Sequence, residues 1–234
     1  MIDKLLSIIE NDKLGNFLDK IKGAYFGILA GITQIIMLIV GSILLNAEEP
    51  MSIGSHWVSS FGGATQGAQY VFIICMSLTI VFCIPFVLDL LRKMMPGNEK
   101  QRWMLVFPLL ISLLVILGGV GLTIFNMREF SIIHVVFATI FFVSAALLVF
   151  FISFIMLFNS EIPKWQGLVG LICCSLYLLF LLPFIPVIMS GTDLVFLITD
   201  LGPTTWYFRV TEWISIIALV GWFIESGVFL LKKF

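Results

Sequence analysis

The sequence predicts an all-α polytopic membrane protein, a six-helix transmembrane bundle with both termini in the cytoplasm. Composition, six long apolar runs and the placement of the lysines and arginines lead to this prediction. Of the 234 residues, 60% are hydrophobic and 12% are charged, whereas soluble domains are about 45–50% apolar and about 25% charged. So much apolar surface is stable only in a bilayer. The net charge of −1 provides no basic surface for nucleic acid, which excludes that class of partner.

Six apolar runs are long enough to cross the hydrocarbon core of a membrane. The predicted spans cover residues 24–45, 69–91, 103–125, 132–158, 165–190 and 210–231. At 1.5 Å per residue, about 22 residues reach roughly 33 Å, and the hydrocarbon core is about 30 Å thick. The runs are continuously apolar, which favours helices over the alternating strands of a membrane barrel. The spans and their loops, residues 23–234, are therefore treated as one domain.

The positive charges predict the orientation of the chain. Eleven of the 13 lysines and arginines fall on the side that carries the N-terminal segment, the second and fourth loops and the C-terminal tail. The opposite side has Arg128 and Arg209. Because lysine and arginine accumulate in cytoplasmic loops, both termini are predicted to be cytoplasmic. We assign the chain to the integral multi-pass proteins of the plasma membrane.

The segment before the first span, residues 1–22, has apolar residues at helical spacing with charges between them. Leu14, Leu18 and Ile21 illustrate the pattern. The segment has no compact apolar core or cleavage site, so it is not a signal peptide. It is predicted to lie as an amphipathic helix on the cytoplasmic face of the membrane. Within the first span, Gln34 shares a face with small residues, which predicts close helix packing and one interhelical hydrogen bond.

Polar residues and prolines mark the second and fifth spans. Asp89 is followed by Arg92 and Lys93, which predicts an ion pair at the cytoplasmic end of the second span. Pro183 and Pro186 predict a kink in the outer half of the fifth span. The four cysteines all lie in apolar runs without metal-ligand spacing, so they are interpreted as small buried apolar residues.

The outer side carries the two longest loops, 46–68 and 191–209, which are predicted to fold over the helix ends. His134 lies near the beginning of the fourth span, on a face of small residues that indicates helix contact, and a buried ring needs partners for its nitrogens. Arg209 and Glu212 are three residues apart near the beginning of the sixth span, so they can pair on one helix face. His134 and Glu212 therefore share a membrane level.

These observations predict a polar ligand site on the outer side. Its candidate residues are His56, His134, Asp193, Asp200, Arg209 and Glu212. A lipid headgroup is the predicted ligand, with Arg209 on its phosphate. Membrane lipids are thus the predicted partners, and a homo-oligomer or a second membrane protein is left open. No catalytic residue, metal or cofactor is assigned, and the sequence favours a non-enzymatic function without deciding the question.

Two alternatives to lipid binding stay open. The first is a metal-dependent intramembrane lipid hydrolase, with His56, His134 and either Glu212 or Asp193 as ligands. The chain contains no HExxH or paired-cysteine motif that would favour it. The second is a non-catalytic scaffold or regulator, in which the polar residues are structural.

Two segments carry a family resemblance: "SIIHVVFATIFF" at the fourth span and "RVTEWISIIALVGWF" at the sixth. With six spans and cytoplasmic termini, the chain resembles the DRAM/Frag/Sfk family and related uncharacterised bacterial and archaeal six-span membrane proteins. The resemblance implies handling of membrane lipids, including lipid organisation and GPI-anchor remodelling, and implies that His134 and Glu212 belong to the site. The loop "SIGSHWVSSFGG" is only loosely similar to the family's serine-containing loop, so His56 is not carried over.

Overall fold

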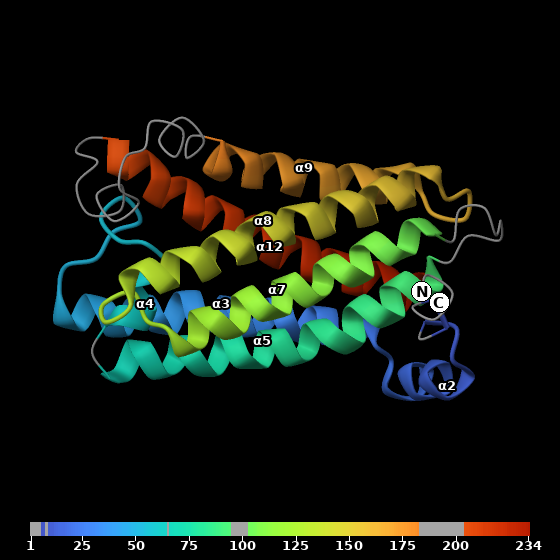
Figure 1. Ribbon diagram of the computed structural model, residues 1–234, viewed down its shortest axis with the longest axis horizontal. Helices are drawn as coiled ribbons and strands as arrows, with labels where there is room; N and C mark the ends of the chain where they lie inside the picture. The colour runs from blue at the N-terminus through green and yellow to red at the C-terminus, as the bar shows by residue number, and fades with distance from the viewer. Residues whose placement is uncertain (1–5, 8, 65, 95–102, 183–203) are drawn as a thin grey trace.

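The computed structural model describes residues 6–7, 9–64, 66–94, 103–182 and 204–234, and these ranges contain helices and no strands (Figure 1). Six of the helices are long and apolar enough to cross a membrane. They are α3 (Ala24–Glu48), α5 (Gln66–Lys93), α7 (Val106–Ile124), α8 (Ser131–Phe158), α9 (Lys164–Leu181) and α12 (Thr204–Lys233). The predicted all-α class and the six spans are confirmed.

The ends of several spans differ from the sequence prediction by a few residues, and the largest difference is at the last helix. The last helix begins at Thr204, before the predicted residue 210. The reason is that Phe208 is buried, at 4% exposure, so packing continues the helix past the polar residues that lowered the hydropathy of this stretch. The third span is preceded by a single 3₁₀ turn, η1 (Trp103–Leu105). Residues 183–190, with the two prolines expected to kink the fifth span, lie outside the described residues.

The six long helices form a closed ring. Each helix packs against the next in the chain, and α12 completes the ring by packing against both α9 and α3. The seam between α5 and α7 has the least extensive packing of these contacts. In Figure 1, α2 (Asp12–Ile21) and the end of α12 lie at one end of the bundle, here called the terminal end. The connection before α5 and the α7–α8 turn lie at the other end, here called the loop end.

Helices α3 and α12 approach each other closely because glycines line the crossing. A Cβ on Gly227 would come within 2.8 Å of the carbonyl oxygen of Ala24, and one on Gly31 within 3.2 Å of that of Val220. Small residues at helix crossings allow such backbone contact in membranes. The small-residue face predicted for the first span is therefore a packing face.

The terminal end is held by two ion pairs. Arg92 of α5 donates two hydrogen bonds to the carboxylate of Asp19 in α2, at 2.9 and 2.7 Å, and this guanidinium lowers the pKa of Asp19. Lys93 pairs with Asp89 at 3.0 Å. The predicted ion pair of Asp89 is thus confirmed for Lys93, whereas Arg92 reaches across to α2 instead. The Arg92–Asp19 contact ties α2 to the end of α5, whereas the Lys93–Asp89 pair lies within α5.

Candidate functional site

The connection formed by residues 49–64 lies against the beginning of α12 at the loop end. The Oε2 atom of Glu212 accepts a hydrogen bond from the backbone N–H of Val58 at 2.7 Å, and its side chain is buried, at 3% exposure. The carboxylate also accepts hydrogen bonds from the backbone and hydroxyl of Ser59. It therefore caps the turn that leads into the short helix α4 (Ser60–Gly63). These charge-assisted bonds offset the cost of burying the carboxylate.

Trp213, the next residue of α12, holds the same connection. Its indole Nε1 donates to the backbone oxygen of His56 at 3.0 Å. The ring of Phe61, which is fully buried, meets the Trp213 ring edge-on with centroids 5.7 Å apart. Residues 49–64 and their partners on α12 are called the loop clamp below.

Arg209 completes the loop clamp. Its Nη1 atom lies 3.5 Å from the backbone oxygen of Gly54, and its guanidinium carbon lies 6.0 Å from the centre of the Trp57 ring. Its buried Nε has no hydrogen-bond partner among the described residues. Arg209 and Glu212 were predicted to pair with each other. The described ion pairs do not include them, because each group contacts the backbone of the loop instead.

His56 takes part in a local network of the same connection. Its Nδ1 lies 2.7 Å from the Ser55 hydroxyl and its Nε2 lies 3.2 Å from a carboxylate oxygen of Glu49. The Ser55 hydroxyl is also hydrogen-bonded to the backbone and side chain of Ser52. These bonds hold Ser55 in a turn, so the network fixes the shape of the loop.

His134 lies in the first turn of α8 and is buried, at 2% exposure. Its Nδ1 lies 2.7 Å from the backbone oxygen of Phe125, a contact that requires a proton on Nδ1 and closes the α7–α8 turn. Its Nε2 has no partner among the described residues. No recorded contact joins His134 to Glu212 in the described part of the chain. The structure thus gathers His56, Arg209 and Glu212 around one loop and gives His134 a different partner.

A metal centre is not assembled in the part of the chain that the structure describes. No group of three or more histidine, cysteine, aspartate or glutamate side chains comes together there. The remaining candidate residues, Asp193 and Asp200, lie outside the described residues.

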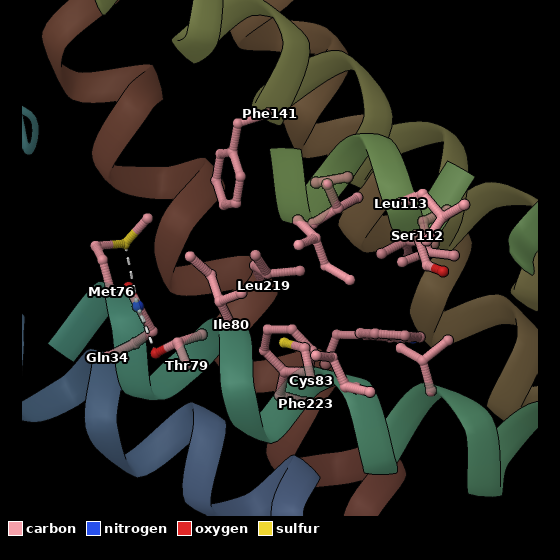
Figure 2. A pocket seen from close by; sticks show the side chains of 18 of the residues that line it. Gln34, Met76, Thr79, Ile80, Cys83, Ser112, Leu113, Phe141, Leu219 and Phe223 are labelled. Carbon is pink, nitrogen blue, oxygen red and sulfur yellow. Dashed lines mark hydrogen bonds between the residues drawn. The ribbon is translucent and has the colours of Figure 1, made fainter. Parts of the chain in front are cut away.

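A cavity of about 270 Å³ lies in the middle of the bundle. Its wall is formed by side chains of α5, α7, α8 and α12, with Gln34 from α3. Figure 2 shows Phe141 on one side of this space and Ile80 and Cys83 of α5 on the other. None of the described lining residues is charged, so the wall suits an uncharged, apolar occupant.

The cavity opens sideways, onto the surface of the bundle that faces the lipid. Three of its lining residues are also exposed on the outside: Ile84 of α5 at 43%, and Leu110 and Leu113 of α7 at 42% and 57%. These residues flank the seam where α5 and α7 pack least extensively. The cavity therefore lies next to the outer surface of the bundle at this seam.

Three polar side chains line this otherwise apolar space: Gln34, Thr79 and Ser112. The Nε2 atom of Gln34 donates to the Thr79 hydroxyl at 2.8 Å and to the Met76 sulfur at 3.4 Å (Figure 2). The interhelical hydrogen bond predicted for Gln34 is confirmed. The cavity beside it was not predicted. The available signal was a polar residue inside each of three apolar spans, but Thr33 in α3 and Ser77 in α5 are also polar and do not line the cavity.

Comparison of the chain with protein-family models, with curated proteins and with solved structures finds no match.

Proposed function

We propose that this integral membrane protein binds a single apolar chain of a membrane lipid, which passes between α5 and α7 into the central cavity. The observation that carries the proposal is the lateral opening, because Ile84, Leu110 and Leu113 belong both to the cavity wall and to the outer surface. Hydrocarbon is the solvent around these residues in a bilayer. A volume of about 270 Å³ lies just below the range of small-molecule pockets, roughly 300–1,000 Å³, which suits one chain.

The orientation and location of the protein belong to the same proposal. The excess of lysine and arginine at the terminal end supports cytoplasmic termini. Spans of 25 to 28 residues, such as α3 and α8, suit the thicker plasma membrane. The loop clamp would then lie on the non-cytoplasmic side.

A second candidate function is contact with a lipid headgroup at the loop clamp. It is favoured by Arg209, whose guanidinium retains an unpartnered Nε among the described residues, next to the aromatic side chain of Trp57. Arginine recognises phosphate through several N–H groups in one plane. Glu212 would act in this site by holding the loop that contains Gly54 and Trp57 in place.

Photolabelling tests the chain-binding proposal. Purified protein in lipid nanodiscs would be irradiated with a lipid whose acyl chain carries a diazirine, and labelled residues would be mapped by mass spectrometry. Labelling at Leu148 and Val149, which are buried but line the cavity, is expected only if the chain enters. Leu113→Trp narrows the opening and is expected to lower this labelling severalfold.

Leu117→Trp is the matched control, because Leu117 is 50% exposed one turn further along α7 and is not a lining residue. Equal labelling of the interior in both variants would contradict the proposal. Arg209→Gln in the same assay distinguishes headgroup contact at the loop clamp from chain binding in the cavity. It should lower the amount of co-purified phospholipid without changing the interior labelling.

A further inference from the structure

The hydrogen bonds of Thr79 fix the orientation of the Gln34 amide. The Thr79 hydroxyl donates its single proton to the backbone oxygen of Cys75 at 2.8 Å. It can therefore only accept from Gln34, so the amide nitrogen of Gln34 must face Thr79. The second amide proton is taken by the sulfur of Met76. Both donors of Gln34 are used, and its Oε1 accepts no recorded hydrogen bond from the described residues.

The other polar groups that line the cavity also have few protons left to donate to an occupant. The Ser112 hydroxyl donates to the backbone oxygen of Leu109 at 2.7 Å and so can only accept from an occupant of the cavity. Trp222 also lines the cavity, but its Nε1 is buried on the side of α9, 3.1 Å from the position of a Cβ on Gly170. The thiol of Cys83 is a weak donor. The polar atoms that the wall offers are therefore mainly acceptors.

An occupant that donates a proton forms a hydrogen bond with such an acceptor, whereas an occupant without a donor leaves the acceptor without one. Gln34 is 4% exposed, so water outside the bundle does not reach its amide freely. A lipid with only ester, ether or ketone oxygens has no proton to donate. A charged headgroup has no counter-charge among the described lining residues.

We propose that the occupant of the cavity is an uncharged single-chain lipid with a hydroxyl group, which donates its proton to Oε1 of Gln34. This inference rests on the proposed function, and it adds the chemical class of the ligand. The chain fills the apolar part of the cavity and the hydroxyl lies on the α3 side, at the Gln34–Thr79 pair.

Competition binding tests the proposed class. Dodecanol and dodecyl methyl ether have the same chain, and only the alcohol can donate. Each would displace the diazirine lipid from the full-length protein, with labelling at Val149 as the readout. The alcohol is expected to bind about three- to tenfold more tightly, the range for one neutral hydrogen bond. Gln34→Leu should remove this preference, because it should lower the affinity for the alcohol and leave the affinity for the ether unchanged.

Thr79→Val provides a test that does not remove Gln34. It frees one amide proton of Gln34 for the occupant, so the ether should gain affinity and the preference for the alcohol should narrow. Thr33→Val is the matched control. Thr33 and Thr79 are both 7% exposed and both donate to the carbonyl four residues earlier, but Thr33 does not line the cavity.

The outcomes separate the two proposals. Equal affinity of dodecanol and the ether for the wild-type protein would overturn the hydroxyl inference and leave chain binding in place. Failure of both compounds to displace the label would overturn both proposals. An unchanged preference in Thr79→Val would also count against the role of the Gln34 amide.

Discussion

The loop clamp and the central cavity use buried polar groups in different ways. In the loop clamp, Glu212 and Trp213 place charge-assisted and neutral hydrogen bonds on the backbone of the loop. In the cavity, Gln34 uses its donors within the wall and leaves an acceptor beside empty space. The first arrangement fixes one conformation of a loop, whereas the second leaves an acceptor that makes no recorded hydrogen bond with the described residues. Polar residues inside one bundle can therefore hold the fold together or stay available to a ligand.

The largest effect is expected for Glu212→Ala. The change removes the acceptor of the Val58 N–H and leaves that donor without a partner in the interior. The free energy of unfolding should fall by about 3 kcal/mol, as for loss of a hydrogen bond to a charged group with an unsatisfied partner. Thermal unfolding in detergent measures the loss, and faster hydrogen exchange over residues 54–62 would locate it in the loop.

Glu129→Ala is the control, because Glu129 lies exposed at the same end of the bundle. Its effect should stay within the roughly ±0.5 kcal/mol of ordinary surface substitutions. If Glu212→Ala were equally mild, the loop clamp would not be held by this carboxylate, and the comparison with the cavity would lose its basis.

Two replacements of an alanine by leucine compare the packed interior of the bundle with the cavity. Ala30 in α3 is fully buried and does not line the cavity, whereas Ala145 in α8 is buried and does. Ala30→Leu should cost about 1–3 kcal/mol, since added methyl groups have no space in a packed core. Ala145→Leu should cost much less, because its side chain extends into the empty volume. Equal losses in thermal unfolding would argue against a cavity of this size.

The spans and their local pairs could be predicted from the sequence because they depend on neighbours in the chain. Continuous apolar runs set the helices, and the pairing of Asp89 with Lys93 follows from their spacing. The sequence could predict that Gln34 forms an interhelical hydrogen bond, since a glutamine among small residues must find a partner on a neighbouring helix. Which helix supplied the partner was not predictable.

The cavity and the loop clamp could not be predicted because both depend on how distant segments pack. The exposed lining residues of the cavity lie where α5 and α7 pack least extensively, and no property of either helix sequence alone determines this seam. Glu212 was expected beside Arg209 or His134, but a backbone N–H of a loop far away in sequence is its partner. Backbone donors carry no sequence signal. The resemblance based on His134 and Glu212 stays a prediction.

The smallest effect is expected at the terminal end, where the Arg92–Asp19 pair lies half in solvent. Its removal tests a polar contact that is neither buried nor beside a cavity. Asp19→Asn should destabilise the docking of α2 by about 0.2–1 kcal/mol, as for exposed ion pairs. Because Arg92 lowers the pKa of Asp19 below its ordinary value of 3.8, the pair contributes above that value and is lost as pH falls through the lowered pKa. The ratio of hydrogen exchange in α2 between Asp19→Asn and the wild type measures this contribution. It should exceed one near neutral pH and approach one in strong acid, and a ratio that does not change with pH would show that Asp19 does not hold α2 through its charge.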